Sequence, residues 1–195
     1  LPPTNFFTAS LADGDFDIDI DGDFDDTGVY DSILEEAVIS IPERTLKWHY
    51  RSRHEHLIAF SNTKIYNNEL ITFPSNMDRI PDHGVEYIYV NDGVYDRGGK
   101  KHNLNEAKRV ATLVFEHINK YPNRSLGVVT FSEAQQHAVE SAIRQIRLQN
   151  SQYEKFFSED NEEEFFVKNL ENVQGDERDT IIFSIGYAKD QNNIM

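Results

Sequence analysis

The chain has 195 residues, enough for one domain with a hydrophobic core, and it contains no cysteine, which excludes disulfides and thiolate metal sites. No apolar run approaches the length needed to span a membrane, and the opening residues LPPT do not form a signal peptide, so we expect a cytoplasmic protein with no membrane partner. The formal net charge of −15 argues against nucleic-acid binding unless the acidic residues gather away from a binding face.

Two acidic stretches account for most of that charge. Eight aspartates lie between positions 13 and 26, and five acidic residues lie between positions 159 and 164. Without them, the acidic and basic residues nearly balance. We therefore predict two acidic loops, a flexible one over residues 8–28 and another over residues 150–164, because like charges at this density repel one another.

The first acidic loop leaves a second function open. Asp17, Asp19, Asp21 and Gly22 fit the first half of a calcium-binding EF-hand loop, but the twelfth position is Gly28 instead of the bidentate glutamate. The pattern does not favour a dedicated metal site. A non-catalytic calcium-binding or acidic protein-interaction module nevertheless remains the alternative to an enzyme.

The next stretch predicts a helix, a strand and a second helix. Residues 32–39 are expected to form a short helix. Leu46, Trp48 and Tyr50 then alternate as in a strand, and the apolar spacing that follows predicts a helix over residues 53–62.

Tyr50 and Arg51 stand where this strand meets the second helix. A planar aromatic ring suits a nucleobase, and a guanidinium fork suits phosphate oxygens. The simpler interpretation is a core aromatic residue followed by a surface charge.

The middle of the chain predicts a short strand over residues 85–90 and a flexible loop over residues 93–101. The loop does not match a phosphate-binding loop, because Gly99 stands where a lysine is needed. Asn103 is placed to cap the following helix, with Glu106 at the third position.

A strand over residues 126–131 leads into another capped helix, with Ser132 and Gln135 forming a predicted capping box. Free amides at a helix start favour an anion, so this strand–helix turn suits a phosphate. Any α/β domain has capped helices after strands, and that interpretation stays open.

Residues 171–179 form a charged loop around Gly175 and lead into a buried strand over residues 180–186. Glycine allows a close approach of the backbone, and Gln174 and Glu177 supply polar groups beside it. A solvated loop before a core strand is the simpler alternative.

Strands alternate with helices from residue 85 to residue 186. This order predicts an α/β fold with a mainly parallel sheet flanked by helices on both faces.

Two of these segments resemble motifs of superfamily 1 helicases. The order Gln174, Gly175, Glu177 and Asp179 before a hydrophobic strand is similar to motif V. The run TLKWHYRSRHEHLIAF, with the Tyr-Arg pair of residues 50–51 between a strand and a helix, is similar to motif IV.

Two further segments extend the resemblance. The strand–turn–helix LGVVTFSEAQQ is similar to motif IVa, and LPPTNFF is similar to the tail of motif III. The motifs stand in the family's order, so residues 1–195 resemble one domain, the second RecA-like domain, a three-layer α/β sandwich. The nearest likeness is to the 5′-to-3′ branch that includes RNA-decay and DNA-replication helicases.

The resemblance implies roles for single residues. Tyr50 would stack on the adenine of ATP and Arg51 would be catalytic, reaching the terminal phosphate. Gln174, Gly175 and Glu177 would also face ATP. A single-stranded DNA or RNA would be bound by four further residues, Thr130, Ser132, Gln135 and Asn172.

The phosphate loop, the acidic magnesium motif and motif VI are not found between the first and last residues, and there is no initiator methionine. We therefore expect a fragment of a longer ATP-dependent helicase or translocase. Its partner would be the first RecA-like domain of the same parent chain, which would hold magnesium. By itself the fragment is expected to be inactive, and whether the nucleic acid is DNA or RNA stays open.

Overall fold

The computed structural model describes residues 33–52, 54–74 and 83–194. The first acidic loop with its calcium-loop pattern, and the LPPTNFF segment, lie outside the described residues.

The chain divides into two compact units, residues 1–86 (unit 1) and residues 87–195 (unit 2). All predicted site residues except Tyr50 and Arg51 lie in unit 2. That residues 1–195 act as a single domain stays a prediction.

Unit 1 is built from two short helices and two short strands. These are α1 (Ile33–Ser40), β1 (Trp48–His49), α2 (His56–Lys64) and β2 (Ile71–Thr72). The two strands pair in parallel, with Trp48 opposite Ile71. Asn62 joins α2 to β2, because its side-chain amide donates to the Leu70 carbonyl at 3.1 Å and accepts from the Leu70 N–H at 3.0 Å.

Sequence patterns located the unit 1 helices better than its strands. Helix α1 confirms the helix expected over residues 32–39, and α2 begins at His56 instead of residue 53. The alternating run that ends at Tyr50 forms a strand over only two residues, and β2 was not predicted. Strands this short offer little periodicity to detect.

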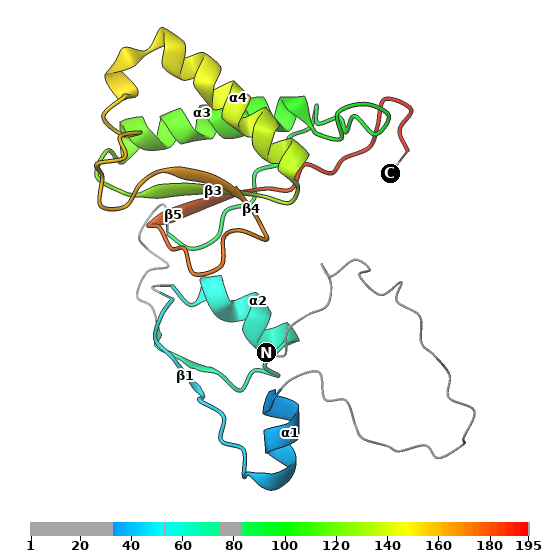
Figure 1. The fold of residues 1–195 in the computed structure, drawn as a ribbon, viewed down its shortest axis with the longest axis vertical. Helices are drawn as coiled ribbons and strands as arrows, with labels where there is room; N and C mark the ends of the chain where they lie inside the picture. Colours follow the sequence, from blue (N-terminus) through cyan, green and yellow to red (C-terminus); the bar gives the residue numbers. More distant parts are fainter. Residues whose placement is uncertain (1–32, 53, 75–82, 195) are drawn as a thin grey trace, which may run out of the picture. The chain divides into compact units, whose positions relative to one another are not determined.

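Unit 2 consists of a three-stranded parallel sheet and two long helices (Figure 1). Its elements are α3 (Leu104–Lys120), β3 (Leu126–Thr130), α4 (Glu133–Gln149), the 3₁₀ turn η2 (Ser151–Tyr153), β4 (Phe166–Asn169) and β5 (Thr180–Ser184). The strand order is β4-β3-β5, so β3 is central, and all five of its residues are buried. This architecture is the predicted α/β, RecA-like fold, except that both helices in the described part of unit 2 lie on one face of the sheet instead of on both.

The core of unit 2 lies between the sheet and its helices. Figure 1 shows α3 and α4 over the same face of the sheet. They bury their apolar faces against Leu126 and Val128 of β3. The helical core residues are Ala107, Val110, Ala111, Val114, Phe115, Ile118, Ala138, Val139, Ala142 and Ile143.

Both predicted N-caps of unit 2 form. The Asn103 side chain accepts from the Glu106 N–H at 3.1 Å, and the Ser132 hydroxyl accepts from the Gln135 N–H at 3.2 Å. The reciprocal half of the second capping box was wrong. The Gln135 amide turns inward to other buried groups instead of reaching back to Ser132.

The strand expected over residues 85–90 was also wrong, because these residues form no ladder with another described strand. Val85, Tyr87 and Tyr89 alternate as a strand would, but their side chains are 70–79% exposed. Conversely, β4 was missed, because its four residues FVKN follow closely on the acidic run and give too short a pattern.

The second acidic stretch contains ordered structure. It begins with η2, and the aromatic rings of Tyr153, Phe156 and Phe157 pack against the core. Asn161 closes the next turn by donating to the carbonyls of Lys155 and Phe156 at 3.1 and 3.0 Å. The acidic side chains therefore belong to a segment whose aromatic residues pack against the core.

Candidate functional site

The loop between β4 and β5 is held by contacts of the residues in its second half. The Lys168 ammonium lies 2.6 Å from an oxygen of Asp176. The Arg178 guanidinium donates twice to the Glu164 carbonyl, at 2.9 and 2.7 Å. A fork of two hydrogen bonds orients the guanidinium as well as holding it. The loop therefore has a defined path.

A third anchor joins the end of the loop to the start of β3. The Asp179 carboxylate accepts from the Ser125 N–H at 3.2 Å, and the Asp179 N–H donates to the Ser125 hydroxyl at 2.9 Å. Since Asp179 directly precedes β5, this pair sets where the edge strand begins.

The aromatic ring of Phe166 packs against the side chains that anchor the same loop. The Phe166 ring lies across Gly127, in the space that a Cβ at that position would need. The guanidinium carbon of Arg178 and the ammonium of Lys168 lie 4.9 and 5.0 Å from the centre of the ring. Cations over an aromatic face attract it, so both anchoring side chains are packed as well as hydrogen-bonded.

The predicted nucleotide-binding residues Gln174, Gly175 and Glu177 lie beside these anchored positions and are exposed. Gly175 has φ = +91°, a conformation that other residues rarely adopt, and no atom lies within 4 Å of where its Cβ would be. The glycine therefore shapes the backbone and leaves open space beside it.

Thr130 and Ser132 lie together at the carboxyl end of β3. Thr130 is fully buried, and its hydroxyl donates to the Ser132 carbonyl at 3.0 Å. Ser132 is half-buried at the start of α4. Asn172 lies nearby in the chain path, because its N–H donates to the Asn169 side chain at 3.1 Å, and Asn169 pairs with Thr130 in the sheet.

Gln135, like Thr130, is 0% exposed. Its amide nitrogen donates to the Ser184 hydroxyl at 3.0 Å and to the Asn103 carbonyl at 3.3 Å. Its amide oxygen accepts from the Asn103 N–H at 2.8 Å. Both ends of this amide are therefore occupied by protein groups, so Gln135 organises the site from inside.

Glu106 extends this buried polar network. One of its carboxylate oxygens accepts from the Ser184 hydroxyl at 2.7 Å and from the Gly186 N–H at 2.9 Å. The network thus joins the starts of α3 and α4 to the end of β5. Buried polar groups that are fully paired rigidify a core. Sequence reasoning found the two caps but missed that they meet.

The remaining two candidates, Tyr50 and Arg51, follow β1 in unit 1. Tyr50 is 83% exposed, and Arg51 is also exposed. The structure therefore groups the candidates into three sets: one pair in unit 1, the anchored loop of unit 2, and the carboxyl end of β3.

Burial lowers the pKa of His117, near the end of α3. Among the described residues, no group of three or more histidine, aspartate or glutamate side chains is placed to hold a metal ion. None of the helices in that part of the chain is long and apolar enough to cross a membrane.

Comparison with known proteins finds a matching family and similar proteins. The model of a family described as AAA domain matches residues 29–195. A protein described as an uncharacterized ATP-dependent helicase of Mycoplasma pneumoniae is 34% identical over 204 residues, and a protein of the same description from Mycoplasma genitalium is 35% identical over 204 residues. Both alignments cover 99% of this chain but 17% of the relative.

A parallel sheet covered by two capped helices defines an α/β domain, and the family match agrees with a RecA-like one. The relatives make it a helicase-like domain of superfamily 1. The chain belongs to the AAA-domain family, whose model covers most of its length.

Proposed function

We propose that this chain is the second RecA-like domain of a longer ATP-dependent helicase or translocase, where it supplies half of the ATP cleft. The observation that carries the proposal is the loop before β5. Its anchoring groups are held at 2.6–3.2 Å while Gln174, Gly175 and Glu177 stay exposed. A loop fixed in this way is prepared to meet a ligand without paying much ordering entropy.

Tyr50 and Arg51 would contribute the base-binding and phosphate-binding groups. The largely exposed ring of Tyr50 offers a flat face, and Arg51 follows it directly. Magnesium-bound ATP supplies the phosphoryl group that is transferred. The role of Arg51 is to stabilise negative charge on the phosphate oxygens, and that of Glu177 is to orient groups from the loop.

The first RecA-like domain of the parent chain would hold the magnesium and the other face of the nucleotide. Such enzymes couple hydrolysis between two domains to movement along a strand. The chain spans about 17% of the length of the curated relatives it matches, so most of the machinery lies elsewhere in such proteins. We therefore propose that this chain by itself neither hydrolyses ATP nor unwinds a duplex, and that its parent works in the cytoplasm.

The same unit would carry part of the surface for single-stranded DNA or RNA. The Ser132 hydroxyl and the free amides at the start of α4 suit a phosphate, and Asn172 stands at the same sheet edge. Thr130 and Gln135, being buried, would position this edge.

The test is ATP hydrolysis by the parent protein in the presence of a single strand. Arg51→Ala should lower kcat by about a hundredfold or more, because an arginine that stabilises the transition state is worth orders of magnitude. Arg44→Ala is the matched control, an exposed arginine of the same unit, and should leave kcat unchanged.

A second pair of variants tests the loop of unit 2. Glu177→Gln should lower kcat about tenfold, since it replaces one of the two carboxylate oxygens that accept hydrogen bonds from the groups Glu177 orients. Glu171→Gln changes an exposed acid of the same loop and should have no effect. Equal rates for Arg51→Ala and the wild type would remove Arg51 from the active site, and hydrolysis by the 195-residue chain alone would overturn the two-domain proposal.

A further inference from the structure

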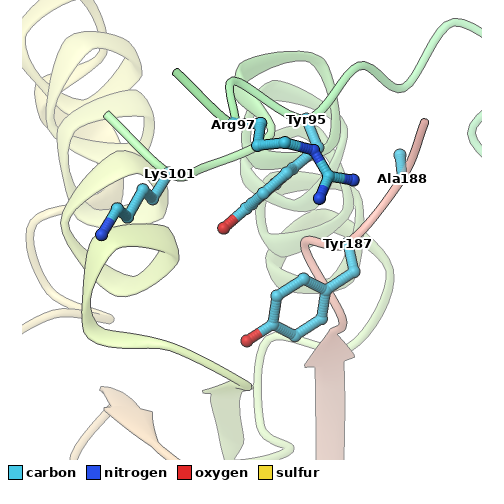
Figure 2. A pocket seen from close by; sticks show the side chains of 5 residues that line it. All are labelled: Tyr95, Arg97, Lys101, Tyr187 and Ala188. Atoms are coloured by element: carbon cyan, nitrogen blue, oxygen red, sulfur yellow. The ribbon is translucent and has the colours of Figure 1, made fainter. Parts of the chain in front are cut away.

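A hollow that no role above accounts for lies beyond the end of β5, entirely within unit 2. Its volume is about 460 Å³, and its lining residues are Tyr95, Arg97, Lys101, Tyr187 and Ala188 (Figure 2). The two tyrosine rings have their centres 5.5 Å apart and are tilted by 49°. Figure 2 shows both hydroxyl groups directed to the same side, with the Lys101 ammonium also on that side.

The two cationic residues of the hollow, Arg97 and Lys101, belong to a turn that is closed by hydrogen bonds. The Asp96 N–H donates to the His102 carbonyl at 2.9 Å, and the Asp96 carboxylate accepts from the Lys100 N–H at 2.8 Å. A Cβ at Gly99 would lie 2.5 Å from that carboxylate, so glycine is needed there. The segment expected to be a flexible loop is therefore a hydrogen-bonded turn.

Hydrogen bonds from the buried polar network hold the backbone next to both tyrosines of the hollow, Tyr95 and Tyr187. The Asn103 side chain accepts from the Val94 N–H at 3.3 Å, directly before Tyr95. Glu106 accepts from the Gly186 N–H at 2.9 Å, directly before Tyr187. The Tyr95 N–H also donates to the Lys189 carbonyl at 3.1 Å. The two aromatic faces are thus fixed from the core of the domain.

The rim of the hollow carries positive charge. Arg97 lies 3.7 Å from an oxygen of Asp190 and donates to the Ile194 carbonyl at 3.5 Å, both long contacts, and half of its side chain is exposed. A guanidinium has five donors, so it keeps capacity for a further anion. Lys101 is exposed and forms no ion pair with the described residues.

We propose that this hollow binds a base and its adjacent phosphate in a single-stranded nucleic acid. Tyr95 and Tyr187 would stack on the base, while Lys101 and Arg97 would face the phosphates. Aromatic faces beside cations are the usual means of holding a single strand without reading its sequence. The inference rests on the proposed function, because it assumes that this unit meets a strand.

The position of the hollow favours a strand over a free nucleotide. Thr130 and Ser184 pair in the sheet and end β3 and β5 at the same edge. Ser132 lies two residues beyond one end and Tyr187 three residues beyond the other. A strand that contacts the start of α4 would therefore reach the hollow along a single edge.

The test uses the 195-residue chain and two probes, six-nucleotide oligo(dT) and oligo(U), followed by nuclear magnetic resonance, which detects weak binding. The ring signals of Tyr95 and Tyr187 should shift upfield as either probe is added. Tyr187→Leu should weaken binding at least about fivefold, the effect of losing one stacking face. Lys101→Gln should reduce the slope of log affinity against log salt by about 0.7.

Tyr121→Leu is the matched control. Tyr121 lies beyond the other end of α3, and its ring has the Lys120 ammonium at 5.1 Å and the Arg124 guanidinium carbon at 4.4 Å. It therefore offers the same chemistry away from the hollow and should leave affinity unchanged. An equal loss in Tyr121→Leu and Tyr187→Leu would overturn the assignment of the hollow.

The remaining outcomes separate the two proposals. Chemical-shift changes at the Thr130 and Ser132 amides without changes at the tyrosine rings would overturn the binding role of the hollow and keep the proposed function. The absence of any shift at millimolar oligonucleotide would overturn both the hollow and the proposed strand-binding surface, and the ATP-cleft proposal would still be decided by the hydrolysis test. A mononucleotide, thymidine or uridine monophosphate, that shifts the tyrosine rings as strongly as the oligonucleotide would assign the hollow to a free nucleotide and overturn the strand.

Discussion

Thirteen hydrophobic residues are buried in unit 2, whereas none of the described hydrophobic residues of unit 1 is buried. Leu46, Trp48 and Phe60 of unit 1 are 90%, 62% and 73% exposed, and α2 has no buried residue. Unit 2 therefore has its own core, and the described part of unit 1 does not.

The comparison teaches what makes a local pattern reliable. In unit 2 the caps, the apolar helix faces and the buried central strand all indicate the same fold, and agreement among levels is what specifies a structure. In unit 1 the alternation around Trp48 predicts a strand face, but the described residues leave most of it exposed: the Phe73 ring lies 5.6 Å from that of Trp48, and both side chains stay largely accessible. Tyr50, the proposed base-binding residue, lies in this less buried unit.

The largest expected effect compares one leucine from each unit. Leu126→Ala in β3 should lower the free energy of unfolding by about 3 kcal/mol, because Leu126 is 0% exposed and its removal leaves a cavity. Leu46→Ala, at a position 90% exposed, should change it by less than about 0.5 kcal/mol. Urea unfolding followed by circular dichroism measures both, and equal losses would break the comparison.

A smaller loss of unfolding free energy is expected when one polar side chain is replaced in each unit. Gln135→Ala should cost about 2 kcal/mol, because it leaves the buried Asn103 N–H without its partner and removes one of the two hydrogen bonds of the Ser184 hydroxyl. Asn62→Ala removes two hydrogen bonds to Leu70 at a half-buried site where water can replace them, so it should cost about half as much.

Hydrogen exchange at the amides of Ser184 and Leu70 would place each loss in its own unit. If Gln135→Ala loosened Leu70 as much as Ser184, the network would not be confined to unit 2. If it changed neither amide, Gln135 would have no organising role.

A structural feature was predictable from the sequence when the residues that form it lie close together along the chain. The caps at Asn103 and Ser132 act over three residues, so their patterns were visible and are confirmed. The strand over residues 85–90 was overpredicted, because alternation alone does not supply a pairing partner.

The candidate site was predictable only in part for the same reason. Gln174, Gly175 and Glu177 share one loop and could be grouped from their spacing. The contact between Tyr95 and Tyr187 joins two segments far apart in the sequence, and only the fold brings them together. The inward turn of Gln135 likewise depends on Asn103 and Ser184, which no local pattern connects to it.

The smallest expected effect tests the buried interior of unit 2 by pH. Burial lowers the pKa of His117; the nearby charge of Arg124 lowers it further, while the hydrogen bond to the Arg124 carbonyl at 3.3 Å and the charge of Asp179 raise it. The folded state therefore holds the neutral imidazole, whereas the unfolded chain takes up a proton near the usual pKa of about 6.5.

Because the folded pKa is the lower one, the stability that neutral His117 contributes is complete above about pH 6.5 and is lost as the pH falls toward the folded pKa. One proton limits the slope to about 1.4 kcal/mol per pH unit. His117→Gln should flatten the dependence of unfolding free energy on pH below 6.5. Its offset from the wild type at pH 8 reports lost packing alone, so a difference that stays constant from pH 8 to pH 5.5 would show that the imidazole is not held neutral.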